Sequence, residues 1–122
     1  VVCGGKLAWR ICDKLKSDLP HRSIEAEQRA HAITIAPDTH LRRIAELCGG
    51  GEVMEVNSRH FEGVMEPGSA VVSARADDGV IEAIEVPGKR YAIGVQWHPE
   101  FYPHEEGLDK ALFDGLIEAA RG

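Results

Sequence analysis

The sequence predicts an α/β fold, because its middle contains several strand-like runs and its end contains one amphipathic helix. The strand-like runs alternate β-branched or other apolar residues with polar ones, and Pro, Gly or Asp residues bound them. From Glu105 to Arg121 the apolar residues instead recur at helical spacing, with acids in the first turn and a base in the last. A chain of 122 residues is long enough for one small domain of this class.

The beginning of the chain predicts a helix and a connection. Within residues 6–19 apolar and charged residues mix at roughly helical spacing, and Pro20 would end a helix there. Residues 21–30 are polar and show no clear period. We therefore expect a short helix followed by a surface segment.

A strand and a second helix are expected next. Residues 31–36 (HAITIA) have strand-like alternation and stop at Pro37, which favours a turn. Thr39 can accept a hydrogen bond from the first turn of a helix, and the three glycines at 49–51 would end that helix.

Four further strands are expected, and the last three of them are expected to form an antiparallel meander. The run 52–56 (EVMEV) is followed by 70–75 (AVVSAR), by 80–86 (VIEAIEV) and by a last strand within 90–96. The sequences Asp-Asp-Gly and Pro-Gly-Lys separate the later runs, and such sequences favour tight turns between neighbouring strands.

The composition argues against nucleic-acid, membrane and disulfide-linked classes of protein. The net charge is −6 with acids spread along the chain, so a surface that follows nucleic-acid phosphates is not expected. No apolar run approaches the ~18 residues of a membrane span, and the first residues lack a signal-peptide pattern. Three cysteines without a C-x-x-C pair indicate free thiols in a reducing compartment. We expect a soluble, cytoplasmic protein.

Polar residues follow the last predicted strand in an order that suggests catalysis. Residues 92–95 are strand-like, and His98, Pro99 and Glu100 come shortly after them. Two residues apart in extended backbone, the histidine and glutamate side chains share one side, so the carboxylate can orient the imidazole as a general base. The alternative is a strand-end turn with two solvated polar side chains.

A metal site is the weaker interpretation of this region. His98, Glu100 and His104 together offer nitrogen and oxygen ligands, but their spacing matches no helical H-E-x-x-H pattern. A metal site is therefore not expected here. Three further histidines are assigned no role: His21, His31 and His40.

A second polar group follows the predicted strand 52–56. Asn57, Ser58 and His60 come where that strand becomes a loop, and polar side chains in such a loop can line the edge of a pocket. Taken alone, the segment is equally well explained as the exit of a strand into a loop.

Considered together, the two polar segments resemble a known family. VNSRHFEGV at 56–64 followed by GVQWHPE at 94–100 is similar to the C-terminal half of class I glutamine amidotransferase-like proteins, and more closely to their γ-glutamyl hydrolase branch of the peptidase C26 type. GGKL at 4–7 resembles the family's Gly-Gly-x-Leu after its nucleophile helix. The resemblance implies a flavodoxin-like fold, a mixed sheet with flanking helices, of which residues 1–122 would be the C-terminal part.

The same resemblance implies roles for the polar residues. His98 would be the catalytic base and Glu100 its orienting acid, while Asn57, Ser58 and His60 would lie on the substrate-side loop. The implied reaction is hydrolysis of a small γ-glutamyl amide through a γ-glutamyl thioester on a cysteine, without metal or cofactor. Two alternatives stay open: a glutaminase subunit that delivers ammonia to a synthetase, and a non-catalytic remnant of the fold.

The sequence departs from the family pattern in the loop after the 52–56 strand. Phe61 and Glu62 stand where the branch commonly has a histidine and a glutamine. We therefore expect a more apolar and more acidic pocket edge, which favours amine-bearing leaving groups over acidic ones.

A further departure concerns the nucleophile, which in the family is a cysteine in a G-x-C-x-G turn. None of Cys3, Cys12 and Cys48 has that sequence around it, and all three are expected to be packing residues. Because the chain also starts without methionine, we expect the N-terminal strands and the nucleophile turn to be absent from it. The chain alone would then be inactive, and it would associate with the missing segment or with itself.

Overall fold

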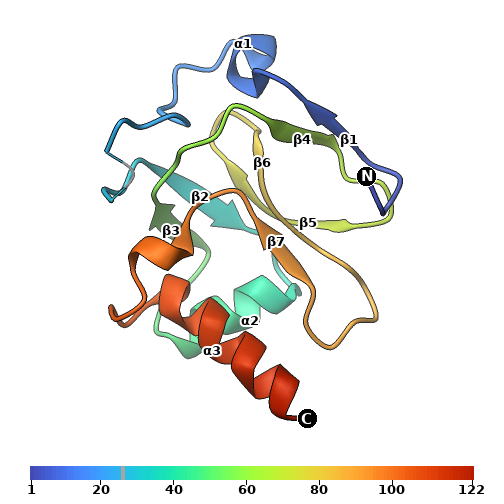
Figure 1. Ribbon diagram of the computed structural model, residues 1–122, viewed down its shortest axis with the longest axis vertical. Helices are drawn as coiled ribbons and strands as arrows, with labels where there is room; N and C mark the ends of the chain where they lie inside the picture. Colours follow the sequence, from blue (N-terminus) through green and yellow to red (C-terminus); the bar gives the residue numbers. More distant parts are fainter. Residues whose placement is uncertain (26) are drawn as a thin grey trace.

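The computed structural model describes residues 1–25 and 27–122, which form a seven-stranded β-sheet with two longer helices packed against it (Figure 1). The strands are β1 (Lys6–Ala8), β2 (His31–Ile35), β3 (Val53–Val56), β4 (Gly63–Glu66), β5 (Val71–Ala76), β6 (Ile81–Glu85) and β7 (Ile93–Val95). The helices are α1 (Ile11–Leu15), α2 (His40–Leu47) and α3 (Leu108–Arg121), with a 3₁₀ turn η1 (Pro99–Phe101). No helix among the described residues is both long enough and apolar enough to span a membrane.

Strand β6 is the centre of the sheet. The strand order is β1-β4-β6-β5-β2-β3, with β7 also on β6, and each of these pairings is antiparallel. β6 pairs with β5 along one edge, and its other edge is shared between two strands. Ile81 pairs there with Val64 of β4, whereas Ala83 to Glu85 pair with β7. β4 and β7 therefore separate from each other beside Glu82.

The α/β class is confirmed, and most of the expected elements are present. β2, β3, β5, β6 and β7 lie within three residues of their predicted bounds, and β5, β6 and β7 form the expected antiparallel meander. α2 begins directly after Thr39, and α3 ends at Arg121. Strand alternation and helical spacing were sufficient to locate these elements.

The helix predicted over residues 6–19 is wrong. Its first part is instead the edge strand β1, which pairs with β4, and only the single turn α1 is helical. Arg10 adopts the left-handed conformation (φ 54°), which separates the two elements. Leu7 and Trp9 are two residues apart, and this is the strand period. Residues 1–5 form turns, not the tail of a helix.

The main core lies between the sheet and the two longer helices, which lie together at one end of the molecule in Figure 1. A smaller cluster under β1 and α1, at the other end, is formed by Ala8, Ile11, Ala76 and Val80. The buried residues of the main core are Ile33, Ile35, Leu41, Ile44, Ala45, Val56, Ala74, Ala83, Trp97, Leu108 and Leu112.

Removing the cap of α2 should destabilise the fold. The buried hydroxyl of Thr39 accepts a hydrogen bond from the backbone N–H of Arg42 at 3.1 Å and donates one to the carbonyl of Ala36 at 2.8 Å. Thr39→Ala is expected to lower the free energy of unfolding by about 1–2 kcal/mol, measured by urea denaturation. Thr39→Ser keeps the hydroxyl and should lose much less, so equal losses in the two variants would contradict this role.

Candidate active site

His98 and Glu100 form a hydrogen-bonded pair just beyond the end of β7. Nδ1 of the imidazole lies 2.7 Å from Oε1 of Glu100, which is within the reach expected from their spacing. Pro99 begins the 3₁₀ turn η1 between them. The His98 side chain is 36% exposed, so the ring can be reached from solvent while one of its nitrogens is held.

Both ring nitrogens of His98 face acceptors. Nδ1 faces the Glu100 carboxylate, and Nε2 lies 3.3 Å from the carbonyl oxygen of Arg59. Because these oxygens can only accept, each contact is a hydrogen bond when the ring nitrogen that faces it carries a proton. Burial raises the pKa of Glu100, but the hydrogen bond with His98 outweighs it and holds that pKa below its ordinary value. The pair therefore suits a residue that gains and gives up a proton.

The backbone of His98 is held by the side chain of Asn57. Oδ1 of Asn57 accepts from the His98 N–H at 2.9 Å, and Nδ2 donates to the His98 carbonyl at 3.0 Å. The preceding residue, Trp97, is buried and donates its indole N–H to Asp109 of α3 at 3.0 Å. The position of His98 is thus fixed from the loop after β3 and from α3.

The three residues predicted for the substrate-side loop have different surroundings. Asn57 contacts the backbone of the His98 pair, as described above. Ser58 is fully buried and donates its hydroxyl to the carbonyl of His21 at 2.7 Å. His60 turns its ring toward Glu82 of β6, with Nε2 3.6 Å from Oε1. Direct contact of these residues with a substrate stays a prediction.

Phe61 and Glu62, which depart from the family pattern, are both exposed. The Phe61 ring stacks on Trp9 with centroids 5.4 Å apart, and the guanidinium carbon of Arg22 lies 3.8 Å from the centroid of the Phe61 ring. The carbonyl of Glu62 accepts from the side-chain amide of Gln96 at 3.4 Å. This bond joins the loop after β3 to the segment that leads to His98, so the two polar segments singled out in the sequence are neighbours.

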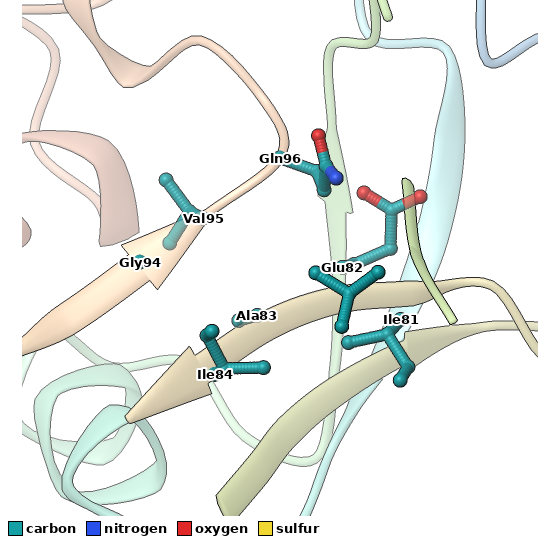
Figure 2. Close-up of a pocket in the computed structure, with 8 residues that line it drawn as sticks. Ile81, Glu82, Ala83, Ile84, Gly94, Val95 and Gln96 are labelled. Carbon is teal, nitrogen blue, oxygen red and sulfur yellow. The ribbon is translucent and has the colours of Figure 1, made fainter. Parts of the chain in front are cut away.

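A pocket of about 190 Å³ opens where β4 and β7 separate along β6. Apolar residues of the three strands form most of its lining, and Glu82 and Gln96 add polar groups. Figure 2 shows the Glu82 carboxylate and the Gln96 amide pointing away from the side chains of Ile81 and Ile84. Because Gln96 lies two residues before His98, the pocket and the His98 pair share the end of β7.

The three cysteines lie in packing or turn positions. Cys48 ends α2, and its Sγ donates to a backbone carbonyl of that helix at 3.1 Å. Cys12 packs against the smaller core, where burial raises the pKa of its thiol and Asp78 raises it further. Cys3 is partly buried in the turn before β1. In the part of the chain that the structure describes, the ring nitrogens of His98 bond to oxygens and not to a thiol.

Three buried histidines surround Glu82, an arrangement that was not predicted from the sequence. We call these four residues, His21, His31, His60 and Glu82, the histidine cluster. Oε1 of Glu82 lies 3.0 Å from Nδ1 of His21, 3.5 Å from Nε2 of His31 and 3.6 Å from Nε2 of His60. The other ring nitrogen of His21 lies 2.6 Å from Asp78. Burial lowers the pKa of His21, but the two neighbouring carboxylates outweigh it and raise that pKa.

The sequence contains little sign of this cluster. In the alternating run IEAIE, Glu82 occupies a position that a half-buried strand would turn to solvent, and the histidines come from distant segments. Among the described His, Cys, Asp and Glu side chains, the group with the spacing of metal ligands is His21, His60 and Glu82. His98, Glu100 and His104, which the sequence offers as possible ligands, do not have that spacing.

Known proteins resemble this chain in sequence. Residues 1–100 match the family model described as Peptidase C26. The γ-glutamyl-γ-aminobutyrate hydrolase of Escherichia coli (strain K12) is 33% identical over 129 residues, a match that covers 99% of this chain and 49% of that protein. A glutamine amidotransferase-like protein of Rickettsia prowazekii is 42% identical over 93 residues, which cover 75% of this chain and 32% of that protein. The chain thus spans about half the length of the hydrolase and less of the second relative.

Solved structures share the fold. A GMP synthase subunit from Thermoplasma acidophilum has a TM-score of 0.63 at 12% identity, over 97% of this chain and 49% of that chain. The glutaminase domain of the Trypanosoma brucei CTPS has a TM-score of 0.58 at 22% identity, over 76% of this chain and 39% of that one. These structures confirm the glutamine amidotransferase-like fold predicted from the sequence.

Removing the Asn57 side chain should loosen the segment that carries His98. Asn57→Ala removes two hydrogen bonds and strips a backbone N–H and a carbonyl of a partner, so the free energy of unfolding should fall by about 2–4 kcal/mol. Urea denaturation measures the loss, and the His98 amide resonance should shift. Asn57→Asp keeps the acceptor for the N–H but buries a charge that faces the His98 carbonyl, so it should not recover the loss. Unchanged stability in Asn57→Ala would contradict this role.

Proposed function

The chain belongs to the Peptidase C26 family, and from this premise we propose that His98 transfers the proton in γ-glutamyl amide hydrolysis, with Glu100 as its orienting acid. The observation that carries the proposal is the 2.7 Å contact between His98 Nδ1 and Glu100 Oε1. A carboxylate in this position holds the imidazole in the tautomer and orientation that proton transfer needs. The substrate class is supported by a relative named γ-glutamyl-γ-aminobutyrate hydrolase.

The proposed reaction has two stages. A cysteine thiolate attacks the γ-carbonyl carbon, the His98 imidazolium gives its Nε2 proton to the amine, and the C–N bond breaks to leave a γ-glutamyl thioester. Water then attacks the thioester, the neutral His98 takes a proton from it, and the C–S bond breaks to release the acid and the thiolate. The imidazolium is regenerated, and neither stage uses a metal or a cofactor.

The cysteine of this proposal lies outside the 122 residues. Cys12 has a raised thiol pKa, which disfavours the reactive thiolate, and Cys48 bonds its own helix. Within the described residues, Cys3 lies in a turn that leads into strand β1 and not into a helix, so no helix N–H groups face its thiol. We propose that residues 1–122 form the C-terminal part of a single domain, whose N-terminal strands and nucleophile turn come from a further segment.

A glutaminase that supplies ammonia to a synthetase is the second candidate. Matches to a CTPS glutaminase domain and to a GMP synthase subunit favour it, although they concern the fold alone. The same His98 pair and the same thioester would serve, with glutamine as substrate and ammonia as leaving group. Turnover of γ-glutamyl amines without a partner enzyme favours the hydrolase, and turnover that depends on a synthetase favours the glutaminase. A non-catalytic remnant would show neither.

Substituting His98 should abolish turnover but not folding. The assay joins the chain at Val1 to the half of the Escherichia coli relative that it does not match, and follows hydrolysis of a γ-glutamyl anilide. His98→Ala is expected to lower kcat by about 10²–10⁴-fold, because a proton-transfer residue is lost. The matched control, His104→Ala, removes an exposed histidine of the same segment and should keep full activity.

Two results would contradict this proposal. The first is retained activity in His98→Ala with an unchanged unfolding transition. The second is hydrolysis by the unextended chain that is lost on alkylation of Cys3, since this would place the nucleophile within the 122 residues.

The exposed carboxylate of Glu62 should influence the choice of leaving group. Two charges about 4 Å apart in water interact by about 1 kcal/mol, so Glu62→Gln should raise kcat/KM for γ-glutamyl-glutamate by about fivefold and lower it for a γ-glutamyl diamine by a similar factor. The same joined protein serves for the assay, and raising the salt concentration should reduce the difference. An unmodified protein that prefers the diacid would contradict the expected preference for amines.

A further inference from the structure

The histidine cluster contains buried polar atoms that lack hydrogen-bond partners. Within the described residues, Nδ1 of His21, Nε2 of His31, Nε2 of His60 and both carboxylate oxygens of Glu82 have no well-aligned partner, although Nδ1 of His21 lies 3.0 Å from Oε1 of Glu82. The four side chains are between 0% and 8% exposed. Buried polar atoms are nearly always satisfied in folded proteins, so a group of five on facing side chains points to a missing component.

The outer nitrogen of each ring is bonded to an atom that can only accept. The partners are a carboxylate oxygen of Asp78 for His21 and backbone carbonyls for His31 and His60, at 2.6, 3.0 and 2.7 Å. Each outer nitrogen therefore carries a proton, so the inner nitrogen is the one that can give up its proton and offer a lone pair to a metal ion. The buried Glu82 carboxylate needs positive charge beside it, and that charge comes either from these inner protons or from a metal ion in their place.

The separations are close to those of metal ligands. Four ligands at Zn–N and Zn–O distances of about 2.0–2.2 Å lie about 3.3–3.6 Å apart in a tetrahedron. Oε1 of Glu82 lies 3.0, 3.5 and 3.6 Å from the three inner nitrogens. The ligand atoms of His21, His60 and Glu82 all lie within 4.8 Å of one another.

We propose that His21, His60 and Glu82 bind one divalent transition-metal ion of the zinc type, with His31 as the neighbouring fourth donor. Imidazole nitrogens with one carboxylate suit zinc, whereas calcium and magnesium prefer oxygen ligands only. Asp78 acts as the outer carboxylate that holds His21 in its metal-binding tautomer, and Ser17 in turn bonds Asp78.

The site is structural, because its ligands are closed to solvent and come from separate parts of the chain. His21 lies in the segment before β2, His60 in the loop after β3, and Glu82 in β6. One ion would join all three. The same loop after β3 carries Asn57, which holds the backbone of His98. The site takes no part in the proposed hydrolysis, so it can be tested without any substrate.

The experiment measures metal binding by the 122-residue chain, prepared without added histidines. After equilibration with Zn²⁺ and removal of free metal, elemental analysis should find about one zinc per chain. Co²⁺ in its place should give the visible absorption of a tetrahedral site with nitrogen and oxygen ligands, without the near-ultraviolet band of a thiolate. Zn²⁺ should also raise Tm in a concentration-dependent way.

Variants identify the ligands. His60→Gln and Glu82→Gln should weaken zinc binding by at least about 100-fold, more than the loss of an outer partner does. His104→Gln and Cys12→Ser, which leave the cluster intact, should bind as the unmodified chain does. If a variant does not fold, the Co²⁺ spectrum of the unmodified chain still shows whether nitrogen and oxygen ligands bind the metal. Three results would overturn the site: no stoichiometric zinc binding, a thiolate band in the Co²⁺ spectrum, or unchanged zinc affinity in both cluster variants. If no zinc binds, protons on the histidines supply the positive charge beside Glu82.

Discussion

The buried carboxylate of Glu82 is the constraint on which the arrangement of sheet and loops depends. A charged group without water is costly unless opposite charge or hydrogen-bond donors surround it. Burial raises the pKa of Glu82, but the neighbouring histidines outweigh it and hold that pKa below its ordinary value, so the group stays charged. Its compensation comes from His21, His31 and His60, and each of these positions fixes a different segment against β6.

This constraint extends to the candidate catalytic pair through the loop after β3. The His60 ring faces Glu82, with Nε2 3.6 Å from Oε1, and Asn57 in the same loop holds the backbone of His98. The His98 ring is oriented separately, by Glu100, whose side chain is 57% exposed. Contacts of the ring are therefore open to screening by salt, whereas the backbone is held in the interior, where screening is weak. The backbone position of His98 thus depends on buried contacts, whereas the orientation of its ring depends on an exposed one.

Local sequence predicted what depends on local spacing. The alternation in β2, β5 and β6, the cap of α2, and the two-residue spacing of His98 and Glu100 all act within a few residues. β1 and β4 were not predicted, because strands of three and four residues have too little alternation to be recognised. The histidine cluster was not predicted for another reason. Alternation along the strand places Glu82 in solvent, and only the folded sheet shows that three imidazoles from distant segments cover it.

The attachment of the outer ribbon, β1 with β4, bears on how the sheet opens. β1 pairs only with β4 among the described strands, and β4 meets β6 at the single register pair of Val64 and Ile81. Segments with so few links to the core open as separate cooperative units, and their amides exchange with solvent before those of the central strands. The pocket in Figure 2 has one wall on this ribbon and the other on β6 and β7. Local opening of this ribbon would therefore change the width of the pocket, whereas the wall that carries Glu82 belongs to the central strand β6.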